Sequence, residues 1–365
     1  MKTIHRICIA DAREMREVAE ASVDLIVTSP PYPMIEMWDG AFSALAPEGG
    51  EALRRHEAAR AFELFHLELD KVWVQCFRVL RPGGIACINI GDATRTIDES
   101  FQLYSNHARI LMSMLRIGFT PLPDILWRKQ TNAPNKFMGS GMLPAGAYVT
   151  YEHEYILIFR KGRNRSFNRA AEKENRRRSA FFWEERNVWF SDMWTDLKGT
   201  NQDLVDPTTR ARSAAFPFEL AYRLVNMYSV YGDMVLDPFA GTGTTMAAAL
   251  ASGRNSIGLE IDEGLRDTIR GTIKNSLRIA TDRIRARLAA HRAFVAERVA
   301  GGQSPKHSNG VHGFPVITSQ EVDLEVLCPL KVAEPFPGSF QVEHGRAEER
   351  EAAVSPGQLM LILET

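Results

Sequence analysis

A short run near the start of the chain, Ser29-Pro30-Pro31-Tyr32, combines groups that suit the binding of a flat molecule with polar edges. The two prolines fix the backbone angle φ and remove two backbone donors. Because a residue that precedes proline is held extended, Ser29 and Pro30 should present a hydroxyl and a carbonyl outward in a rigid arrangement. Tyr32 adds an aromatic face. A nucleic-acid base fits this description, although the run alone is equally consistent with a stiff exit from a strand.

A second run, from Asp237 to Thr245, reads Asp-Pro-Phe-Ala-Gly-Thr-Gly-Thr-Thr. Gly241 and Gly243 permit a tight turn close to a ligand, and the following helix offers free amide donors. Glu260 follows where an acidic residue of a Rossmann-like unit meets ribose hydroxyls, and Asp237 could hold an ammonium group. The full GxGxxG pattern and the lysine of a P-loop are missing from this sequence, which weakens the dinucleotide and nucleoside-triphosphate alternatives. A turn that serves packing alone is the remaining alternative.

The elements that position these runs alternate between strand and helix, which indicates a parallel sheet covered by helices. Residues 33–50 are expected to form a loop with a mobile apolar surface. The other predicted elements are short apolar strands (4–10, 23–28, 85–90, 120–127, 155–159, 235–236, 256–261) and amphipathic helices (to about 21, 51–80, 105–115, 218–230, 246–252, 271–298).

A basic and aromatic stretch interrupts this alternation. Eight arginines or lysines lie between Lys161 and Arg178, and six phenylalanines or tryptophans follow up to Trp194. Such a mixture can hold phosphates and stack on bases, whereas the alternative is a solvated loop with a small core. Since the whole chain has a net charge of −1, this local cluster, which includes Arg176, Arg177 and Arg178, is where nucleic-acid contact is expected.

Composition limits the class of protein further. With 45% hydrophobic and 24% charged residues, the 365-residue chain is typical of a soluble globular protein. Its four cysteines are far apart, which favours reduced core thiols over disulfides or zinc. The sequence shows no signal pattern and no apolar run of about 18 residues. We therefore expect a cytoplasmic protein with no membrane segment and no metal.

Together the two runs resemble the DNA amino-methyltransferases that use S-adenosylmethionine, in the permuted order called the beta class. In that class an S/D/N-P-P-Y/F tetrad precedes a DPFxGxGTT cofactor loop. The resemblance covers about residues 5–262. Five segments occur in the order of this family: 24–32, 78–84, 125–129, 152–159 and 216–220.

The resemblance implies an α/β Rossmann-like methyltransferase fold, with a mostly parallel twisted sheet and helices on both faces. Residues 1–161 would form the catalytic half, and 213–300 the cofactor-binding half. Residues 162–212 would form a DNA target-recognition insert. Beyond the resemblance, the sequence after Gly301 predicts that residues 301–365 form a linker and a small appendage with strands at 322–327 and 359–363.

It also implies roles for individual residues. Ser29, Pro30, Pro31 and Tyr32 would be catalytic, with the Ser29 side chain and the Pro30 carbonyl accepting the protons of the target amine and Tyr32 stacking on a flipped base. Asp11 is equally well explained as a helix N-cap. The residues implied to bind S-adenosylmethionine are Asp11, Phe216, Pro217, Asp237, Pro238, Phe239, Gly241, Gly243, Thr244 and Glu260.

Two tempting side chains are assigned structural roles: Lys129 is expected in a salt bridge and His153 as a satisfied core histidine.

The first tetrad residue bears on the target base. Serine is usual among relatives that methylate cytosine N4, and aspartate among those that methylate adenine N6. The sequence therefore predicts site-specific N4-cytosine methylation of double-stranded DNA in a bacterial or archaeal restriction-modification system. An N6-adenine enzyme, an RNA or protein amine methyltransferase and a non-catalytic DNA-binding protein are the alternatives. A homodimer and a cognate restriction endonuclease are possible partners.

Overall fold

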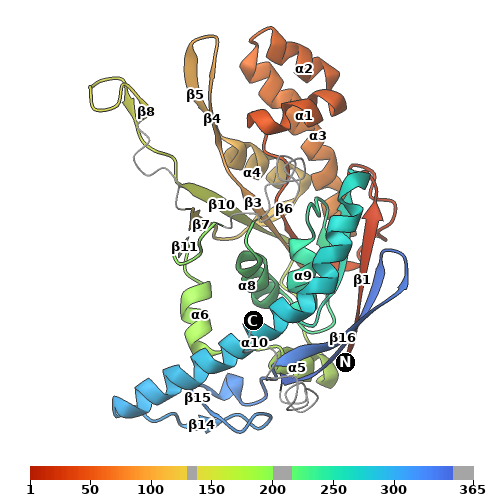
Figure 1. Cartoon of the computed structure of the whole chain (residues 1–365), viewed down its shortest axis with the longest axis vertical. Coiled ribbons are helices and arrows are strands. Elements are labelled where there is room, and N and C mark those ends of the chain that lie inside the picture. Colours follow the sequence, from red (N-terminus) through yellow and green to blue (C-terminus); the bar gives the residue numbers. More distant parts are fainter. Residues whose placement is uncertain (130–137, 200–215, 348–365) are drawn as a thin grey trace, which may run out of the picture.

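Five parallel strands form the centre of a mixed 11-stranded sheet (Figure 1). The computed structural model describes residues 1–129, 138–199 and 216–347. The sheet order is β11-β7-β10-β3-β2-β12-β13-β1-β17-β16, with β6 paired to β10 off this path. The parallel strands are β3 (Leu80–Ile90), β2 (Val23–Thr28), β12 (Met234–Asp237), β13 (Asn255–Glu260) and β1 (Lys2–Ile9). The predicted α/β fold with a mostly parallel sheet is confirmed.

Further strands extend both sides of this centre, with antiparallel pairing of β10 to β3 and of β17 to β1, whereas β11 pairs parallel with β7. On one side lie β10 (His153–Lys161), β7 (Ile125–Arg128), β6 (Phe119–Pro121) and β11 (Met193–Trp194), and on the other β17 (Ser339–Arg346) and β16 (Leu327–Phe336). Short hairpins stand apart from the sheet: β4 (Ala93–Ile97) with β5 (Ser100–Tyr104), β8 (Met138–Gly139) with β9 (Ala147–Tyr148), and β14 (His307–Ser308) with β15 (Pro315–Val316).

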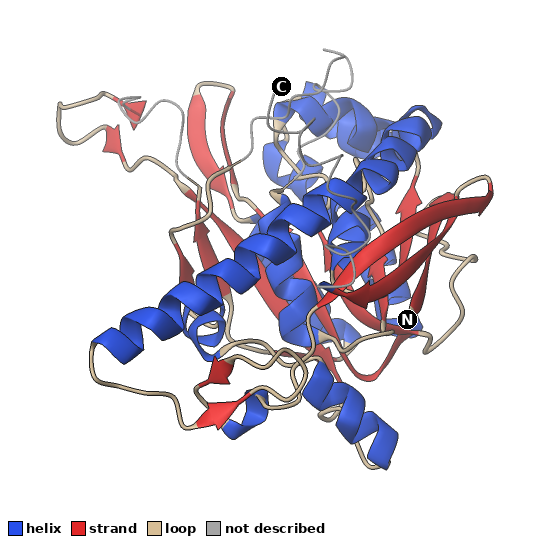
Figure 2. Ribbon diagram, turned by 60° about the horizontal axis from the view of Figure 1, so that its bottom comes forward, coloured by secondary structure: helices blue, strands red, loops and turns tan. Residues whose placement is uncertain are grey.

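Helices cover both faces of the sheet, and the long α10 crosses one of them (Figure 2). This double cover explains why every residue of β2 is buried. Ile26 joins the core cluster under α3 and α4, whereas Leu25 and Val27 join the cluster under α8 and α9. The helices are α1 (Asp39–Leu45), α2 (Pro47–Arg54), α3 (Ala58–Val79), α4 (Asn106–Ile117), α5 (Ala170–Arg178), α6 (Trp183–Trp189), α8 (Phe218–Tyr228), α9 (Thr244–Ala251) and α10 (Arg266–Ala300).

The structure corrects three local predictions near the N-terminus. Residues 33–50 contain η1 (Glu36–Trp38), α1 and the start of α2, not a loop, because Phe42 packs on Phe65 of α3 with ring centroids 5.0 Å apart. The predicted helix 51–80 is interrupted between α2 and α3, where His56 has φ +61°. The predicted helix before residue 21 is a series of turns. Local periodicity did not reveal these breaks.

Residues 162–199 are integrated into the main fold. β11 pairs with β7 in the large sheet, and α6 is fixed to α10 by the ion pair of Glu185 with Arg287 at 2.6 Å. The hydrogen bond between His291 Nδ1 and Glu184 Oε1, at 2.7 Å, joins the same two helices. The C-terminal hairpin β16–β17 likewise extends the large sheet through β1. Strand β16 begins at Leu327, so the strand predicted at 322–327 is wrong, and the one predicted at 359–363 lies outside the described residues.

No helix within these described ranges is long and apolar enough to span a membrane.

Candidate active site

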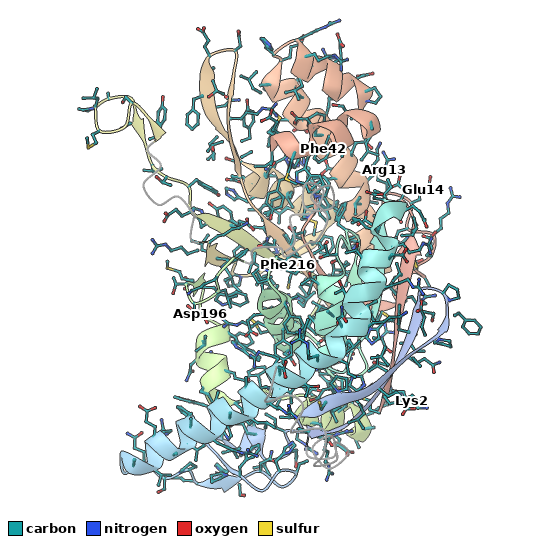
Figure 3. All side chains as sticks on the ribbon, viewed as in Figure 1. Lys2, Arg13, Glu14, Phe42, Asp196 and Phe216 are labelled. Carbon is teal, nitrogen blue, oxygen red and sulfur yellow. The ribbon has the colours of Figure 1, made fainter. Side chains whose placement is uncertain are left out.

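The carboxyl ends of the parallel strands meet at one edge of the sheet, where ligands of open α/β sheets bind. Figure 3 shows the direction of β1: Lys2, where the strand begins, lies in the lower part of the view, and Arg13, just past the strand, lies in the upper part, at the second edge of the sheet. At this second edge β1 leads to Asp11, β2 to Ser29, β12 ends at Asp237 and β13 ends at Glu260. Because these strands run parallel, their carboxyl ends bring four predicted site residues together.

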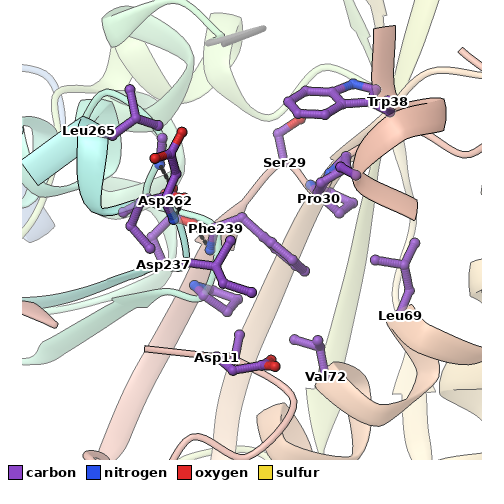
Figure 4. A pocket seen from close by; sticks show the side chains of 18 of the residues that line it. Asp11, Ser29, Pro30, Trp38, Leu69, Val72, Asp237, Phe239, Asp262 and Leu265 are labelled. Atoms are coloured by element: carbon purple, nitrogen blue, oxygen red, sulfur yellow. Dashed lines mark hydrogen bonds between the residues drawn. The ribbon is translucent and has the colours of Figure 1, made fainter. Parts of the chain in front are cut away.

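A cavity of about 420 Å³ opens at this edge. Figure 4 shows Ser29 and Trp38 on one side of it and Asp237 and Asp262 on the other, with Asp11 below. Of the predicted tetrad, Tyr32 does not line the cavity, and of the predicted cofactor residues Pro217 and Gly243 do not. The predicted residues that do line it are Asp11, Ser29, Pro30, Pro31, Phe216, Asp237, Pro238, Phe239, Gly241, Thr244 and Glu260.

Asp237 is a buried carboxylate at the wall of this cavity, with 2% of its surface exposed. Its Oδ1 accepts hydrogen bonds from the Thr28 hydroxyl at 2.6 Å and the Phe239 amide at 3.1 Å. Burial raises the pKa of Asp237 to about 6, although hydrogen bonds from Thr28 and Thr245 act in the opposite direction. A cationic group in the cavity would favour the ionised form of this carboxylate.

The glycine turn brings backbone donors to the same wall. Gly241 and Gly243 have φ of +54° and +85°, a region that side chains with a Cβ rarely adopt. The Gly241 amide donates to Glu260 Oε2 at 2.8 Å, and the Asp262 amide donates to Oε1 at 2.9 Å. Burial raises the pKa of Glu260, while these amide bonds lower it. Glu260 is thus fixed with both oxygens at the cavity edge.

Asp11 is held by a neighbouring arginine. Its Oδ1 accepts from the Arg13 amide at 2.8 Å, and its Oδ2 pairs with the Arg13 guanidinium at 2.6 Å. Arg13 also pairs with Glu68 of α3 at 2.6 Å, and its hydrogen bond lowers the pKa of Asp11. Asp11 caps a turn here and begins no helix, while its side chain lines the cavity.

Tyr32 and Ser29 belong to a hydrogen-bond network behind the cavity. Ser29 Oγ lies 3.0 Å from the Tyr32 hydroxyl, which donates to Glu154 Oε2 at 3.0 Å. Asn89 Nδ2 donates to the same hydroxyl at 2.9 Å and to Glu154 Oε2 at 2.7 Å. Burial, followed by the charge of Glu154, raises the pKa of Tyr32 well above its usual value. Lys129 Nζ lies 2.9 Å from Glu154 Oε1, so the predicted salt bridge of Lys129 is present.

His153 is half-buried between Tyr151 and Tyr155, with ring centroids 4.5 and 5.0 Å away. The ring contacts agree with a packing role for this histidine.

The three arginines predicted to bind DNA lie at the opposite edge of the sheet. Their helix α5 is anchored where Asn175 donates to the Tyr231 carbonyl, just before β12, whose far end carries Asp237 (Figure 1). Arg177 pairs with Asp323 at 2.9 Å and Arg178 with Glu325 at 2.6 Å. The structure therefore does not bring Arg176, Arg177 and Arg178 to the cavity, because the loop after β10 leaves from the other edge.

The sequence pattern of the DNA methylase family matches residues 23–270, a span that holds both the tetrad and the glycine turn. The chain belongs to this DNA methylase family. The Type II methyltransferase M.MthZI of Methanothermobacter thermautotrophicus is 51% identical over 330 residues, covering 90% of this chain and 92% of the relative. M.MjaI of Methanocaldococcus jannaschii, also a Type II methyltransferase, is 49% identical over 278 residues, covering 73% and 90%.

A solved structure shares the fold of this DNA methylase. TTHA0409 of Thermus thermophilus, in complex with S-adenosyl-L-methionine, is 34% identical with a TM-score of 0.58. The match covers 74% of this chain and 95% of TTHA0409.

The opposite wall of the cavity in this DNA methylase was not predicted. This wall is formed by η1, α1 and α3. Trp38 and Phe42 are four positions apart, a spacing that places two side chains on one face of a helix, so this pair could have indicated the wall from the sequence. Glu154 and Asn89 were also not predicted, because their hydrogen bonds to Tyr32 join segments that are distant in sequence. The unpredicted lining residues include Met37, Trp38, Ala41, Phe42, Leu45, Glu68, Leu69, Val72, Asp262 and Leu265.

No group of three or more histidine, cysteine, aspartate or glutamate side chains that could hold a metal ion occurs in the described part of this DNA methylase.

Proposed function

We propose that this DNA methylase transfers the methyl group of S-adenosylmethionine to the exocyclic N4 amine of cytosine at a specific site in duplex DNA. One observation carries the proposal: Ser29 and Pro30 line the same cavity as Asp237 and Gly241. An amine held by the first pair would meet a donor held by the second. Such positioning is the main way an enzyme can accelerate a reaction between two bound molecules.

The cavity residues fit S-adenosylmethionine. The buried Asp237 carboxylate suits an ammonium group, and the fixed oxygens of Glu260 suit ribose hydroxyls. Leu69, Val72 and Phe239 provide apolar walls for the remainder. When bound, this cofactor supplies a methyl group on a positively charged sulfur, so the protein need not supply an acid. TTHA0409, which binds the same cofactor, supports this assignment.

The tetrad would receive the target base after it leaves the duplex, since its exocyclic amine is otherwise inaccessible. That amine is a poor nucleophile because its lone pair is delocalised into the ring. The Ser29 hydroxyl oxygen and the Pro30 carbonyl would accept its two N–H bonds and so favour a tetrahedral nitrogen. Tyr32 would contribute its ring to the stacking surface.

We assign the DNA to the face that carries the cavity. The β4–β5 hairpin leaves the carboxyl end of β3, the β8–β9 hairpin lies between β7 and β10, and α1 and α2 follow the tetrad (Figure 1). Stacking of Phe101 on Tyr148, with ring centroids 4.7 Å apart, joins the two hairpins. Between β8 and β9, Met142 and Leu143 are 84% and 70% exposed. Apolar side chains on such a projection can enter between base steps.

Nucleoside mass spectrometry of DNA methylated by the purified enzyme tests the proposal. We expect N4-methylcytosine, and none with Ser29→Ala. N6-methyladenine without N4-methylcytosine would overturn the choice of base and support the adenine alternative. Parallel reactions with RNA and with protein identify a different substrate class if only these gain methyl groups.

The proposal includes a role in a restriction-modification system, because M.MthZI and M.MjaI are Type II methyltransferases. Base-resolved sequencing of the methylated DNA should show one short recognition sequence. Methylation scattered without a common sequence would contradict this part of the proposal.

A further inference from the structure

We infer that Glu154 is a positioning residue that acts through Tyr32 to turn the lone pairs of the Ser29 hydroxyl toward the target amine. The inference rests on the proposed function, since it concerns the same amine. Sequence patterns gave no role to Glu154, which lies 125 positions after Ser29 (154 − 29) and comes from β10. Only 8% of its surface is exposed.

Strand pairing places this carboxylate behind the tetrad. β10 runs antiparallel to β3, with Ile156 opposite Asn89 and Tyr155 opposite Ile90. On its other side β10 pairs with β7, with Glu154 opposite Trp127. Asn89 therefore approaches Glu154 from β3, Lys129 from the residue that follows β7, and Tyr32 from the loop after β2.

The partners of Glu154 fix the direction of each hydrogen bond. A carboxylate only accepts, and here Oε1 faces the Lys129 ammonium at 2.9 Å while Oε2 faces the Asn89 amide nitrogen at 2.7 Å. The Tyr32 hydroxyl must then donate its one hydrogen to Oε2, 3.0 Å away. Its oxygen already accepts from Asn89 at 2.9 Å and retains one accepting site.

The remaining acceptor position on the Tyr32 oxygen determines how Ser29 forms its hydrogen bond. Because Tyr32 has no second hydrogen to give, the 3.0 Å contact between the two hydroxyls requires Ser29 to donate. A serine hydroxyl has one hydrogen and two lone pairs, so Ser29 is left as an acceptor on the cavity side. Without Glu154, Tyr32 could donate to Ser29 instead, and the Ser29 hydrogen would be free to point at the amine and oppose its attack.

A second observation concerns the hydrogen bonding of Asn89, which contacts both Tyr32 and Glu154. Asn89 directs its amide nitrogen at both Tyr32 and Glu154, and its Oδ1 is buried with no hydrogen-bond partner among the described residues. A buried acceptor without a hydrogen-bond partner is destabilising. Asn89 therefore keeps the orientation that orders Tyr32 and Glu154, although its own Oδ1 makes no hydrogen bond.

Four variants test the inference on full-length enzyme with duplex DNA. Glu154→Ala should lower kcat about 10–100-fold with little change in KM for DNA, because the loss concerns the reacting amine. Glu154→Gln should recover most of this activity, since its amide oxygen can occupy the position of Oε2 while the exposed Lys129 moves away. Tyr32→Phe, which keeps the ring, should match Glu154→Ala. Glu152→Ala is the matched control, because it removes a carboxylate two positions earlier that pairs with Arg128 at 3.2 Å.

The double variant Glu154→Ala/Tyr32→Phe distinguishes positioning from simple loss of stability. If Glu154 acts through Tyr32, the double variant should be no slower than either single variant. Multiplied losses, a Glu154→Ala kcat equal to that of the wild type, or equal losses in Glu154→Ala and Glu154→Gln would each overturn the inference. If the wild type methylates no DNA at all, the proposed function fails instead, so the two failures are distinguishable.

Discussion

The Thr28 hydroxyl donates a 2.6 Å hydrogen bond to the carboxylate of Asp237, and both side chains are buried. Thr28 directly precedes the run Ser29-Pro30-Pro31-Tyr32, and Asp237 opens the glycine turn 209 positions later. A second bond runs between the same segments, from the Thr245 hydroxyl to the Val27 carbonyl at 3.1 Å. The two runs proposed to hold the target base and the cofactor are thus joined directly by hydrogen bonds.

Thr28→Val should weaken cofactor binding. Valine keeps the shape of threonine but removes one buried donor to Asp237, while the Phe239 amide still donates to the same oxygen. Loss of this charge-assisted bond costs about 1–3 kcal/mol, which corresponds to roughly 5–150-fold in Kd if it falls on the bound state. Isothermal titration calorimetry with S-adenosylmethionine measures the change. Unchanged affinity would show that Thr28 has only a packing role.

Cofactor binding should weaken in mild acid. Since the pKa of Asp237 is raised to about 6, the carboxylate is ionised above that pH and protonated below it. An ammonium group favours the ionised form, so affinity should fall as pH decreases, by about tenfold between pH 7 and pH 5. Asp237→Asn should bind weakly at both values and lack this dependence. An affinity that rises on acidification would contradict the assignment.

Gly91→Ala should slow methyl transfer without affecting cofactor affinity. A Cβ at Gly91 would lie 2.9 Å from Cε2 of the Tyr32 ring, so the ring must shift away from its hydrogen-bond partners. We expect kcat to fall about tenfold, measured with saturating cofactor. Gly271→Ala in α10 is the matched control, since no atom lies within 4 Å of its added Cβ. A Gly91→Ala enzyme with normal kcat would show that the ring position is not critical.

Replacement of Arg176, Arg177 and Arg178 by alanine should leave DNA affinity and its salt dependence nearly unchanged. The three residues lie at the edge of the sheet opposite the cavity, and two of them already pair with carboxylates. Fluorescence anisotropy with a labelled duplex at several salt concentrations checks this. A weaker affinity for DNA with a smaller salt dependence would instead show that the arginines of α5 contact DNA.

Met142→Ser/Leu143→Ser should raise KM for duplex DNA by about tenfold, because the exposed tip would lose its apolar contact with the bases. A duplex with a mismatch at the target base should restore the activity, since a mismatched base leaves the stack more easily. Equal losses on matched and mismatched DNA would argue against a role in base extrusion.

The sequence was sufficient to predict the parts of the site that are local in the chain. Ser29 and Asp237 each lie where a short apolar strand ends, and the parallel pairing of these strands brings both residues to the carboxyl edge of the sheet. Glu154 could not be predicted, because its role depends on the pairing of three strands and not on its neighbours in sequence. Residues 33–50 were assigned to a loop for a similar reason: the position of α1 depends on the packing of Phe42 on Phe65 of α3, which is distant in sequence.

The arginines of α5, predicted to contact DNA, show how tertiary partners bear on a cluster of charge. A cluster of positive charge predicts phosphate binding only if the charges remain free and face the substrate. Arg177 and Arg178 are paired with Asp323 and Glu325, which are 146 and 147 positions away and invisible to local inspection. A cluster of positive charge in a sequence therefore indicates a phosphate-binding surface only once the ion-pair partners of its residues in the folded chain are known.

The C-terminal hairpin has a consequence for self-association. β17 satisfies the backbone donors and acceptors of β1, which would otherwise be exposed at the border of the sheet as a template for another chain. β16 becomes the new border, and it is a poor template: it contains Pro329 and Pro335, carries Lys331 and Glu334, and has two register shifts. Loss of this hairpin should therefore favour aggregation through β1 before it affects the chemistry at the far edge of the sheet.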